Sequence, residues 1–361
     1  MRVAFIGDVG LFGRNSLSNS DWQRDIEPVK GILASCDYVV ANLETPLTTQ
    51  KRPIGGKSAY LKGRPEDVEL LKALNITHVT LANNHAYDYG KQGLLDTISV
   101  LEENGVEWYG VNDKTVSISD SDNSLALMGY CCYSTNGMGL DEKPPYINEL
   151  APKRVEKDIS EALSKEMFPV VSFHWGQEHV HYPNYDHVEL SRRLCENKAI
   201  IIHGHHPHVI QGIEEYGASL VAYSLGNFCF DDVYTKKSSF PLIKLSQANQ
   251  ESFVLIANFK NNKVESYEIV PFSFYEGQYK IDDSIAEELR EYSDFLETPE
   301  DEYIHKRSSD LQKYLNGRKQ MRDLSWYLKR LNFESFRIIT NSRRNSKMYN
   351  KLVKEFVSSE R

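Results

Sequence analysis

The sequence predicts an α/β protein in which helices cover the faces of a β-sheet. Short apolar runs rich in β-branched residues recur through the first 270 residues, and segments of helical periodicity separate most of them. Nearly every apolar run is followed at once by a polar side chain. Alternating strands and helices are typical of helix-covered sheets, and such sheets collect their chemistry beyond the carboxyl ends of the strands.

The predicted strands are, in chain order, VAFI (3–6), YVVAN (38–42), HVTLA (78–82), LALMGY (125–130), PVVSF (169–173), AIII (199–202) and SLVAYS (219–224). Segments 65–75 and 92–105 have the spacing of amphipathic helices, and the second ends at Gly105, a residue type that favours helix termination. Residues 253–272 predict an antiparallel hairpin around the turn 260–263.

After residue 280 the apolar spacing becomes helical. We therefore predict an α/β domain over residues 1–275 and a mainly helical, basic extension over residues 276–361. Residues 301–361 hold 15 Lys+Arg against 7 Asp+Glu, whereas residues 1–300 hold 27 against 44. The simplest interpretation is that the basic extension lies against its own acidic body.

The composition, with 40% hydrophobic and 26% charged residues among 361, is that of a globular protein with a substantial core. No apolar run approaches the roughly 18 residues that span a bilayer, and the N-terminus lacks the pattern of a signal peptide. We expect a cytoplasmic chain without a transmembrane anchor. The five scattered cysteines form no CxxC pair and are expected to be reduced. The acidic body and the lack of a nucleic-acid-binding motif argue against a nucleic-acid partner.

Six strand candidates are followed by potential metal ligands. The polar residues in question are Asp8, Asn42 and Glu44, Asn83 to His85, His174 and Glu178, the histidines of IIHGHHPHVIQG (201–212), and Asn227. Carboxylate, amide and imidazole groups together suit zinc, manganese, iron or cobalt better than calcium, which binds oxygen ligands. His206 and His208 lie two residues apart around Pro207, so an extended loop places both rings on one side.

These segments resemble the CapA/PgsA family of capsule and poly-γ-glutamate synthesis proteins, which is similar to the calcineurin-like metallophosphatase superfamily. The segments that carry the resemblance, in the order of the family, are GDVGLFGR (7–14), ANLETPLT (41–48), LANNHAYDYGKQGLLDT (81–97), SFHWGQE (172–178), GHHPHVIQGIE (204–214) and AYSLGNFCFD (222–231). The resemblance covers roughly residues 1–272. It implies a four-layer α/β/β/α sandwich with a metal centre at one edge.

Carried over to this sequence, the resemblance implies a set of metal ligands: Asp8, Glu44, Asn84, His174, His206 and His208. It implies Glu44 as the bridging carboxylate and His85 as the acid-base group. Arg14 and Glu178 are expected to bind substrate anions or to orient a histidine, and no ligand role follows for His203 or His205. The wider superfamily has a histidine two residues after its first aspartate, where this chain has Gly10, so one or two divalent ions (Mn, Zn or Fe) are expected.

Three functions fit these features. The first is hydrolysis of a phosphate ester or an amide by metal-activated water, with His85 as proton donor. The second is epimerisation of a peptide, in which a histidine such as His85, His174, His179 or His181 removes an acidic Cα proton. The third is a non-catalytic role in polymer assembly, with the helical extension as docking surface.

The partner expected for all three is an anionic small molecule, peptide or polymer. Apolar residues at near-helical spacing in the extension predict packing on the body or on a second subunit, and so a possible homo-oligomer: Leu311, Tyr314, Leu315, Leu324, Tyr327, Leu328 and Leu331.

Overall fold

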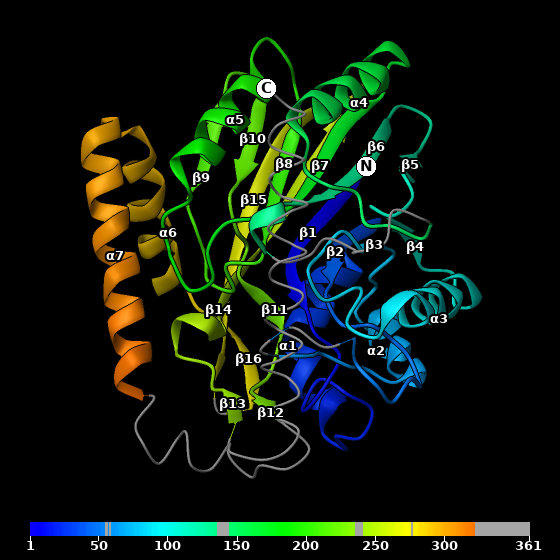
Figure 1. Ribbon diagram of the computed structural model, residues 1–361. Helices are drawn as coiled ribbons and strands as arrows, with labels where there is room; N and C mark the ends of the chain where they lie inside the picture. The colour runs from blue at the N-terminus through cyan, green and yellow to red at the C-terminus, as the bar shows by residue number, and fades with distance from the viewer. Residues whose placement is uncertain (55–56, 58, 136–143, 235–240, 276, 322–361) are drawn as a thin grey trace.

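Two β-sheets stack face to face in the computed structural model, and helices cover their outer faces (Figure 1). The structure describes residues 1–54, 57, 59–135, 144–234, 241–275 and 277–321. The four-layer α/β/β/α sandwich expected from the resemblance is confirmed.

The first sheet has the strand order β16-β15-β14-β1-β2-β3-β4, with β11 also paired to β1. Its strands are β1 (Arg2–Val9), β2 (Tyr38–Leu43), β3 (His78–Thr80), β4 (Glu107–Tyr109), β11 (Asn227–Cys229), β14 (Glu251–Lys260), β15 (Lys263–Tyr275) and β16 (Gln278–Ile281). Strands β1, β2, β3 and β4 are parallel, whereas β14 runs antiparallel to β1.

The second sheet has the order β5-β6-β7-β8-β10-β9, and β12 and β13 form a separate small ribbon. Its strands are β5 (Val116–Ser119), β6 (Ser124–Cys131), β7 (Phe168–His174), β8 (Ile201–His205), β9 (Ile213–Tyr216) and β10 (Ser219–Ala222), and the ribbon consists of β12 (Val233–Tyr234) and β13 (Pro241–Ile243). Strands β6, β7, β8 and β10 are parallel, so their carboxyl ends meet at one edge.

Helices α1 (Trp22–Ala34), α2 (Val68–Ala73) and α3 (Gly90–Glu103) pack on the outer face of the first sheet. Helices α4 (Pro152–Ser164) and α5 (Tyr185–Cys195) cover the second sheet, and α7 (Glu300–Met321) lies beside α5. Helix α6 (Ser284–Asp294) closes one side between β9 and β15 (Figure 1). Four short 3₁₀ turns complete the described elements: Pro65–Asp67, Tyr133–Thr135, Ala248–Gln250 and Phe295–Glu297.

The layers follow from the two-residue period of the strands. On β1, Ala4 and Ile6 face α1 to α3, whereas Val3 and Phe5 face the second sheet. Three large apolar clusters among the described residues correspond to the spaces between helices and first sheet, between the two sheets, and between second sheet and helices. Both faces of each sheet are therefore buried over much of their area.

The predicted strands and the helices predicted over residues 65–75 and 92–105 are present, and the hairpin turns at Asn261 and Asn262, whose φ angles of 53° and 55° suit asparagine. One boundary differs in an important way. The run predicted as a strand over residues 199–202 begins at Ile201 and continues to His205, so His203 and His205 belong to β8 rather than to the loop after it.

The boundary predicted at residue 275 remains a prediction. Strand β16 joins the first sheet, and α6 and α7 contact the sandwich. The predicted apolar positions Leu324, Tyr327, Leu328 and Leu331 lie outside the described residues. None of the helices that the structure describes is both long and apolar enough to cross a membrane.

Candidate metal centre at the edge of the two sheets

The carboxyl ends of strands from both sheets meet at one edge of the sandwich. From the first sheet come Asp8 in β1 and Glu44 directly after β2. From the second sheet come His174, the last residue of β7, and the loop 206–208 that follows β8. Because parallel strands end together, residues more than 190 positions apart in sequence become neighbours.

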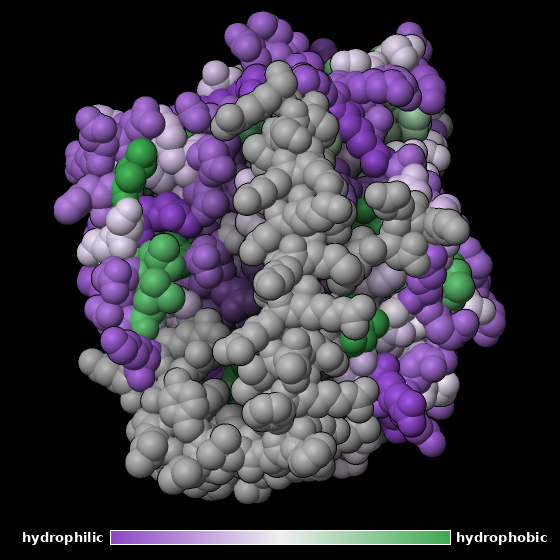
Figure 2. Space-filling view, viewed as in Figure 1, coloured by the Kyte–Doolittle hydropathy of each residue, from purple (hydrophilic) through white to green (hydrophobic). Residues whose placement is uncertain are grey.

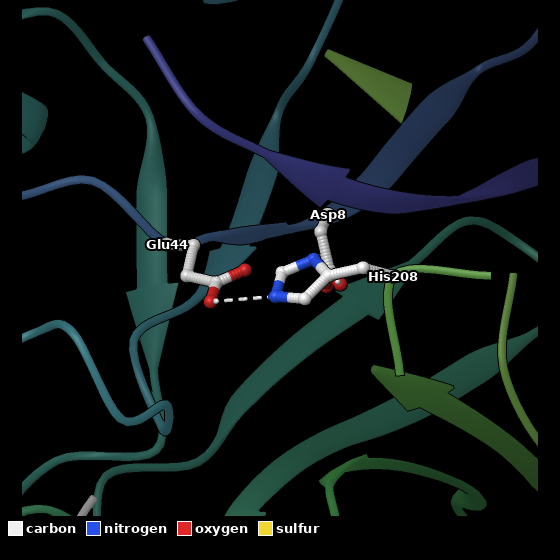
Figure 3. A group of neighbouring side chains, drawn as sticks. All are labelled: Asp8, Glu44 and His208. Atoms are coloured by element: carbon white, nitrogen blue, oxygen red, sulfur yellow. Dashed lines mark ion pairs between the residues drawn. The ribbon is translucent and has the colours of Figure 1, made fainter. Parts of the chain in front are cut away.

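Asp8, Glu44 and His208 form the tightest part of this edge, and each offers one ligand atom within 4.8 Å of the others. His208 Nε2 lies 3.6 Å from Glu44 Oε1, and its Nδ1 lies 3.4 Å from Asp8 Oδ2. Figure 3 shows the imidazole of His208 reaching from its loop to lie between the two carboxylates. Two carboxylates and an imidazole at these distances are a suitable ligand set for a borderline divalent metal.

Asn84, His174 and His206 lie together beside this group. His174 Nε2 is 3.1 Å from Asn84 Oδ1, and the rings of His174 and His206 have centroids 4.8 Å apart. Burial, followed by the neighbouring histidines, lowers the pKa of His174 well below its usual value. Burial likewise lowers the pKa of His206 to about 3. Both are therefore neutral near pH 7, the form in which imidazole binds metals.

Unpaired buried atoms provide the test of whether a metal fits these residues. Among the described residues, neither carboxylate oxygen of Glu44, nor Nδ1 of His206, has a hydrogen-bond partner, although all three atoms are buried. Burial, and next the charges of Asp8 and Glu178, raise the pKa of Glu44 well above its usual value. A buried carboxylate without a partner is costly. Divalent cations would offset this cost, and the residues present therefore fit such ions.

The loop that carries His206 and His208 has an unusual backbone. Both residues have positive φ angles, 97° and 56°, a conformation that costs residues other than glycine about 1–3 kcal/mol. Three contacts hold it: the His206 amide donates to Asp8 Oδ2 (3.1 Å), the His179 amide to the carbonyl of Pro207 (2.8 Å), and Asn249 Nδ2 to the carbonyl of His208 (2.8 Å). These contacts aim both imidazoles at the strand ends.

His85 lies beside Glu44, with Nε2 3.9 Å from Glu44 Oε1. Its Nδ1 is 2.7 Å from Asp88 Oδ2, and Lys57 Nζ is 2.8 Å from the other oxygen of Asp88. Burial lowers the pKa of His85 although Asp88 opposes the shift. Asp88 thus holds the imidazole so that Nε2 is the atom presented to the cluster.

The other two residues expected at the site are placed differently. Arg14 pairs with Asp231 at 2.6 Å and lies over the ring of Phe274. Glu178 lies at the partly exposed rim; burial would raise its pKa, but His206 and His208 together lower it. No role for Arg14 or Glu178 follows from these contacts alone, and their catalytic assignment remains a prediction.

His179 and His181, considered as alternative bases, are already engaged. His181 Nδ1 is 3.1 Å from the carbonyl of Ile210, and its ring stacks on Tyr292. His179 Nδ1 is 2.8 Å from Asn249 Nδ2, and its ring lies against Tyr314 of α7.

Several of the polar residues at strand ends received no role from sequence reasoning and prove to support the site. Asn42 Nδ2 donates to Asp8 Oδ1 (2.9 Å), Asn83 Nδ2 to Asn42 Oδ1 (3.0 Å), and Asn227 Oδ1 is 2.9 Å from His208 Nδ1. His205 Nδ1 lies 3.1 Å from Asp8 Oδ1. All lie inside the six motifs, so their position after strands was the available signal; what each contacts depends on the fold.

The fold and the site together define a class of α/β proteins that carry a buried carboxylate–histidine cluster, suited to divalent metals, where two stacked sheets end. The chain belongs to the family of the bacterial capsule synthesis protein PGA_cap, whose model matches residues 2–232.

Two curated relatives agree with this membership. The PGA biosynthesis protein CapA of Bacillus subtilis is 30% identical over 289 residues, covering 76% of this chain and 72% of the relative. The capsule biosynthesis protein CapA of Bacillus anthracis is 27% identical over 277 residues, covering 73% and 64%.

Among solved structures, the NAD nucleotidase of Haemophilus influenzae is similar with a TM-score of 0.45 and 12% identity, covering 87% of this chain and 60% of the nucleotidase. The calcineurin-like phosphoesterase YfkN of Bacillus subtilis is similar with a TM-score of 0.42 and 12% identity, covering 81% and 96%.

Proposed function

We propose that this protein is a metal-dependent hydrolase that cleaves a phosphate ester or an amide bond in the synthesis of a capsule or poly-γ-glutamate polymer. The observation that carries the proposal is the environment of Glu44. Its carboxylate accepts no hydrogen bond from the described residues, and Oε1 lies 3.6 Å from His208 Nε2 and 3.9 Å from His85 Nε2. The polymer is suggested by the names of the two CapA relatives.

Asp8, Glu44 and His208 would hold one divalent ion, and Glu44 with Asn84, His174 and His206 a second. Bound divalent ions lower the pKa of water and polarise a phosphoryl or carbonyl oxygen. Because His174 and His206 are already neutral near pH 7, neither imidazole has to release a proton when a metal binds, which favours occupancy.

His85 would handle the proton of the leaving group. Its Nδ1–H donates to Asp88, so Nε2 is the atom that accepts or delivers a proton next to the cluster. Lys57 forms an ion pair with Asp88 and also contacts the carbonyl of Asn84. These two contacts would fix the position of the ligand Asn84 relative to the acid-base group His85.

The same placement of His85 supports a second candidate, epimerisation. An unprotonated Nε2 beside a cation could remove the Cα proton of a peptide whose carbonyl is polarised. Substrate hydrolysis consumes water and releases a new end group, whereas epimerisation does neither. The basic extension is proposed to bind a second subunit or an assembly partner. Truncation after Met321, which keeps the buried Tyr303 of α7, would test whether activity on a small substrate survives the loss of residues 322–361.

The decisive experiment measures metal content and hydrolysis together. The wild type, a His206→Ala/His208→Ala variant and a His305→Ala control would be loaded with Mn, Zn or Fe and analysed by elemental mass spectrometry. His305 is an exposed histidine of α7 and leaves the site untouched. One or two metals per chain in wild type and control, lost in the double variant together with hydrolysis of aryl phosphate esters or anilides, supports the proposal. Metal binding without hydrolysis of either substrate class contradicts it.

A further inference from the structure

His203 and His205 are left without a role by the proposed metal centre, yet they are among the most buried polar residues of the chain. They begin a continuous series of polar contacts between the two sheets. The series starts at Asp8 Oδ1, which lies 3.1 Å from His205 Nδ1, and continues from His205 Nε2 to His203 Nδ1 over another 3.1 Å. It then passes from His203 Nε2 to Ser172 Oγ (2.7 Å) and ends at the hydroxyl of Tyr109, 2.7 Å from Ser172 Oγ.

The alternation of β8 explains why these histidines point inward. His203 and His205 are two residues apart and lie on the face that carries Ile201, which packs between the sheets. The ring of His203 lies 5.1 Å from that of Phe5 on β1. The series therefore crosses the sandwich within its apolar interior, where an unmatched donor or acceptor is costly.

Only one direction of donation satisfies both ends. If each hydrogen points toward Asp8, Tyr109 donates to Ser172, Ser172 to His203 Nε2, His203 Nδ1–H to His205 Nε2, and His205 Nδ1–H to the carboxylate. Reversed donation would leave the Tyr109 hydroxyl without an acceptor among the described residues. It would also set a lone pair of His205 against an acceptor-only carboxylate. His205 Nδ1 forms no well-aligned hydrogen bond among the described residues, and the carboxylate of Asp8, 3.1 Å away, is the acceptor within reach.

This direction assigns separate tasks to the oxygens of Asp8. Oδ1 receives Asn42 Nδ2 and faces His205 Nδ1. Oδ2 accepts from the His206 amide and lies 3.4 Å from Nδ1 of His208, the third member of the candidate ligand group. His205 itself is not part of the group whose ligand atoms all lie within 4.8 Å of one another.

We propose that Tyr109, Ser172, His203 and His205 form a buried positioning relay that fixes both histidines as Nδ1–H tautomers and holds Asp8 with Oδ2 toward the metal. The relay rests on the proposed metal-dependent function, but its hydrogen-bond order is a property of the metal-free chain. None of the four residues touches substrate; each acts through Asp8.

Long-range ¹H–¹⁵N correlation spectra of the metal-free protein would test the hydrogen-bond order directly. Nδ1–H on both His203 and His205 is expected. Nε2–H on either histidine would overturn the relay, whatever the result for catalysis. Because this measurement needs neither metal nor substrate, failure of the proposed function and failure of the relay give different results.

Metal affinity tests the positioning role. Ser172→Ala breaks the series, and Ser191→Ala removes an equally buried serine hydroxyl that donates to the carbonyl of His187 within α5. Loss of a partner behind a ligand typically lowers metal affinity 10- to 100-fold, so Ser172→Ala is expected to bind Mn about 10-fold more weakly by titration calorimetry. Tyr109→Phe, which keeps the ring, should shift the His203 nitrogen signals in the same sense as Ser172→Ala. Wild-type affinity in Ser172→Ala, or an equal loss in Ser191→Ala, would refute the positioning role.

Discussion

Glu44 and His85 show how burial sets the properties of individual residues at this site. Both oxygens of Glu44 are buried and accept no hydrogen bond from the part of the chain that the structure describes, whereas Asp8 at the neighbouring strand end has donors on each oxygen. Burial alone would raise the pKa of Asp8, but His205, His208 and Asn42 together lower it. The pKa values of these two carboxyl groups thus shift in opposite directions, because Asp8 has hydrogen-bond donors whereas Glu44 would need a cation to stabilise its charge.

Replacing His85 by glutamine separates proton transfer from metal binding. His85 lies outside the Asp8–Glu44–His208 group, so metal content should remain that of the wild type. Turnover of an ester with a poor leaving group should fall by about 10²–10⁴, the usual contribution of a positioned acid or base. Steady-state kinetics with alkyl and nitrophenyl esters would check this, and an equal fall for both leaving groups would argue against a role as general acid.

A histidine remote from the proposed ligands makes stability depend on pH. His187 stacks on Trp175 at 4.6 Å, and burial lowers its pKa to about 4. Below pH 6.5, about the pKa of histidine in the unfolded chain, His187 is protonated when the chain is unfolded but stays neutral when it is folded. Stability due to this group is therefore complete above pH 6.5 and falls by about 1.4 kcal/mol per pH unit as the pH drops toward 4.

The variant His187→Phe keeps an aromatic ring against Trp175 but cannot bind a proton. Urea unfolding of metal-free protein between pH 6 and 4.5 should give a free energy of unfolding that declines less steeply than in the wild type, by about one proton. Parallel curves for the two proteins would show that His187 protonates equally in both states.

At the scale of elements, α7 and the loop after β7 stabilise one another. The Tyr303 hydroxyl donates to the carbonyl of Pro183 (3.0 Å), and its ring packs on Phe295 and Tyr185. Farther along α7, Asp310 accepts from the amide of His181. Of the predicted apolar positions in α7, Tyr314 lies against His179 whereas Leu315 is exposed, so the packing of the extension through these positions stays a prediction.

Substitutions at Tyr303 measure this packing. Tyr303 is fully buried, so Tyr303→Ala should lower the free energy of unfolding by about 3–5 kcal/mol, as for other large-to-small changes in cores. Tyr303→Phe keeps the ring and loses one hydrogen bond, which should cost about 0.5–1.5 kcal/mol. Both values can be obtained from urea titrations, and a loss below 1 kcal/mol for Tyr303→Ala would mean that α7 contributes little to the described fold.

At the scale of the whole molecule, the candidate centre joins the two sheets. Asp8 and Glu44 come from the first sheet, and His174 and the loop with His208 come from the second. Most of the described surface in the view of Figure 2 is hydrophilic, with separate hydrophobic areas. Many of the apolar residues lie instead in the three large internal clusters. A cation at this edge would link the two sheets where the carboxyl groups of Asp8 and Glu44 otherwise lie close together.

Metal addition should therefore stabilise the folded state as a whole. Binding to the native chain alone stabilises it by about 2.7 kcal/mol when the free ion is at 100 times its dissociation constant. Calorimetry should show a higher Tm with Mn or Zn for the wild type and little change for His206→Ala/His208→Ala. An equal rise in Tm for both proteins would place the binding site elsewhere.

Much of the fold could be predicted because it depends on local patterns. Apolar runs with β-branched residues marked the strands, the helical spacing over residues 92–105 marked α3, and two asparagines marked the hairpin turn. The position of Asp8, Glu44 and His174 at strand ends placed them at one edge, since parallel strands of one sheet end together.

What the sequence by itself determined is the order of elements, the family and the list of polar residues at strand ends. Only the tertiary structure decided which partner each of them has. Sequence reasoning assigned no ligand role to His203 and His205, and the structure shows where they lie: β8 extends through His205, so this pair points between the sheets, whereas His206 and His208 follow in a loop. The physical reason is that side-chain direction alternates along a strand, while contacts such as His205 with Asp8 form between residues that only the stacking of two sheets brings together.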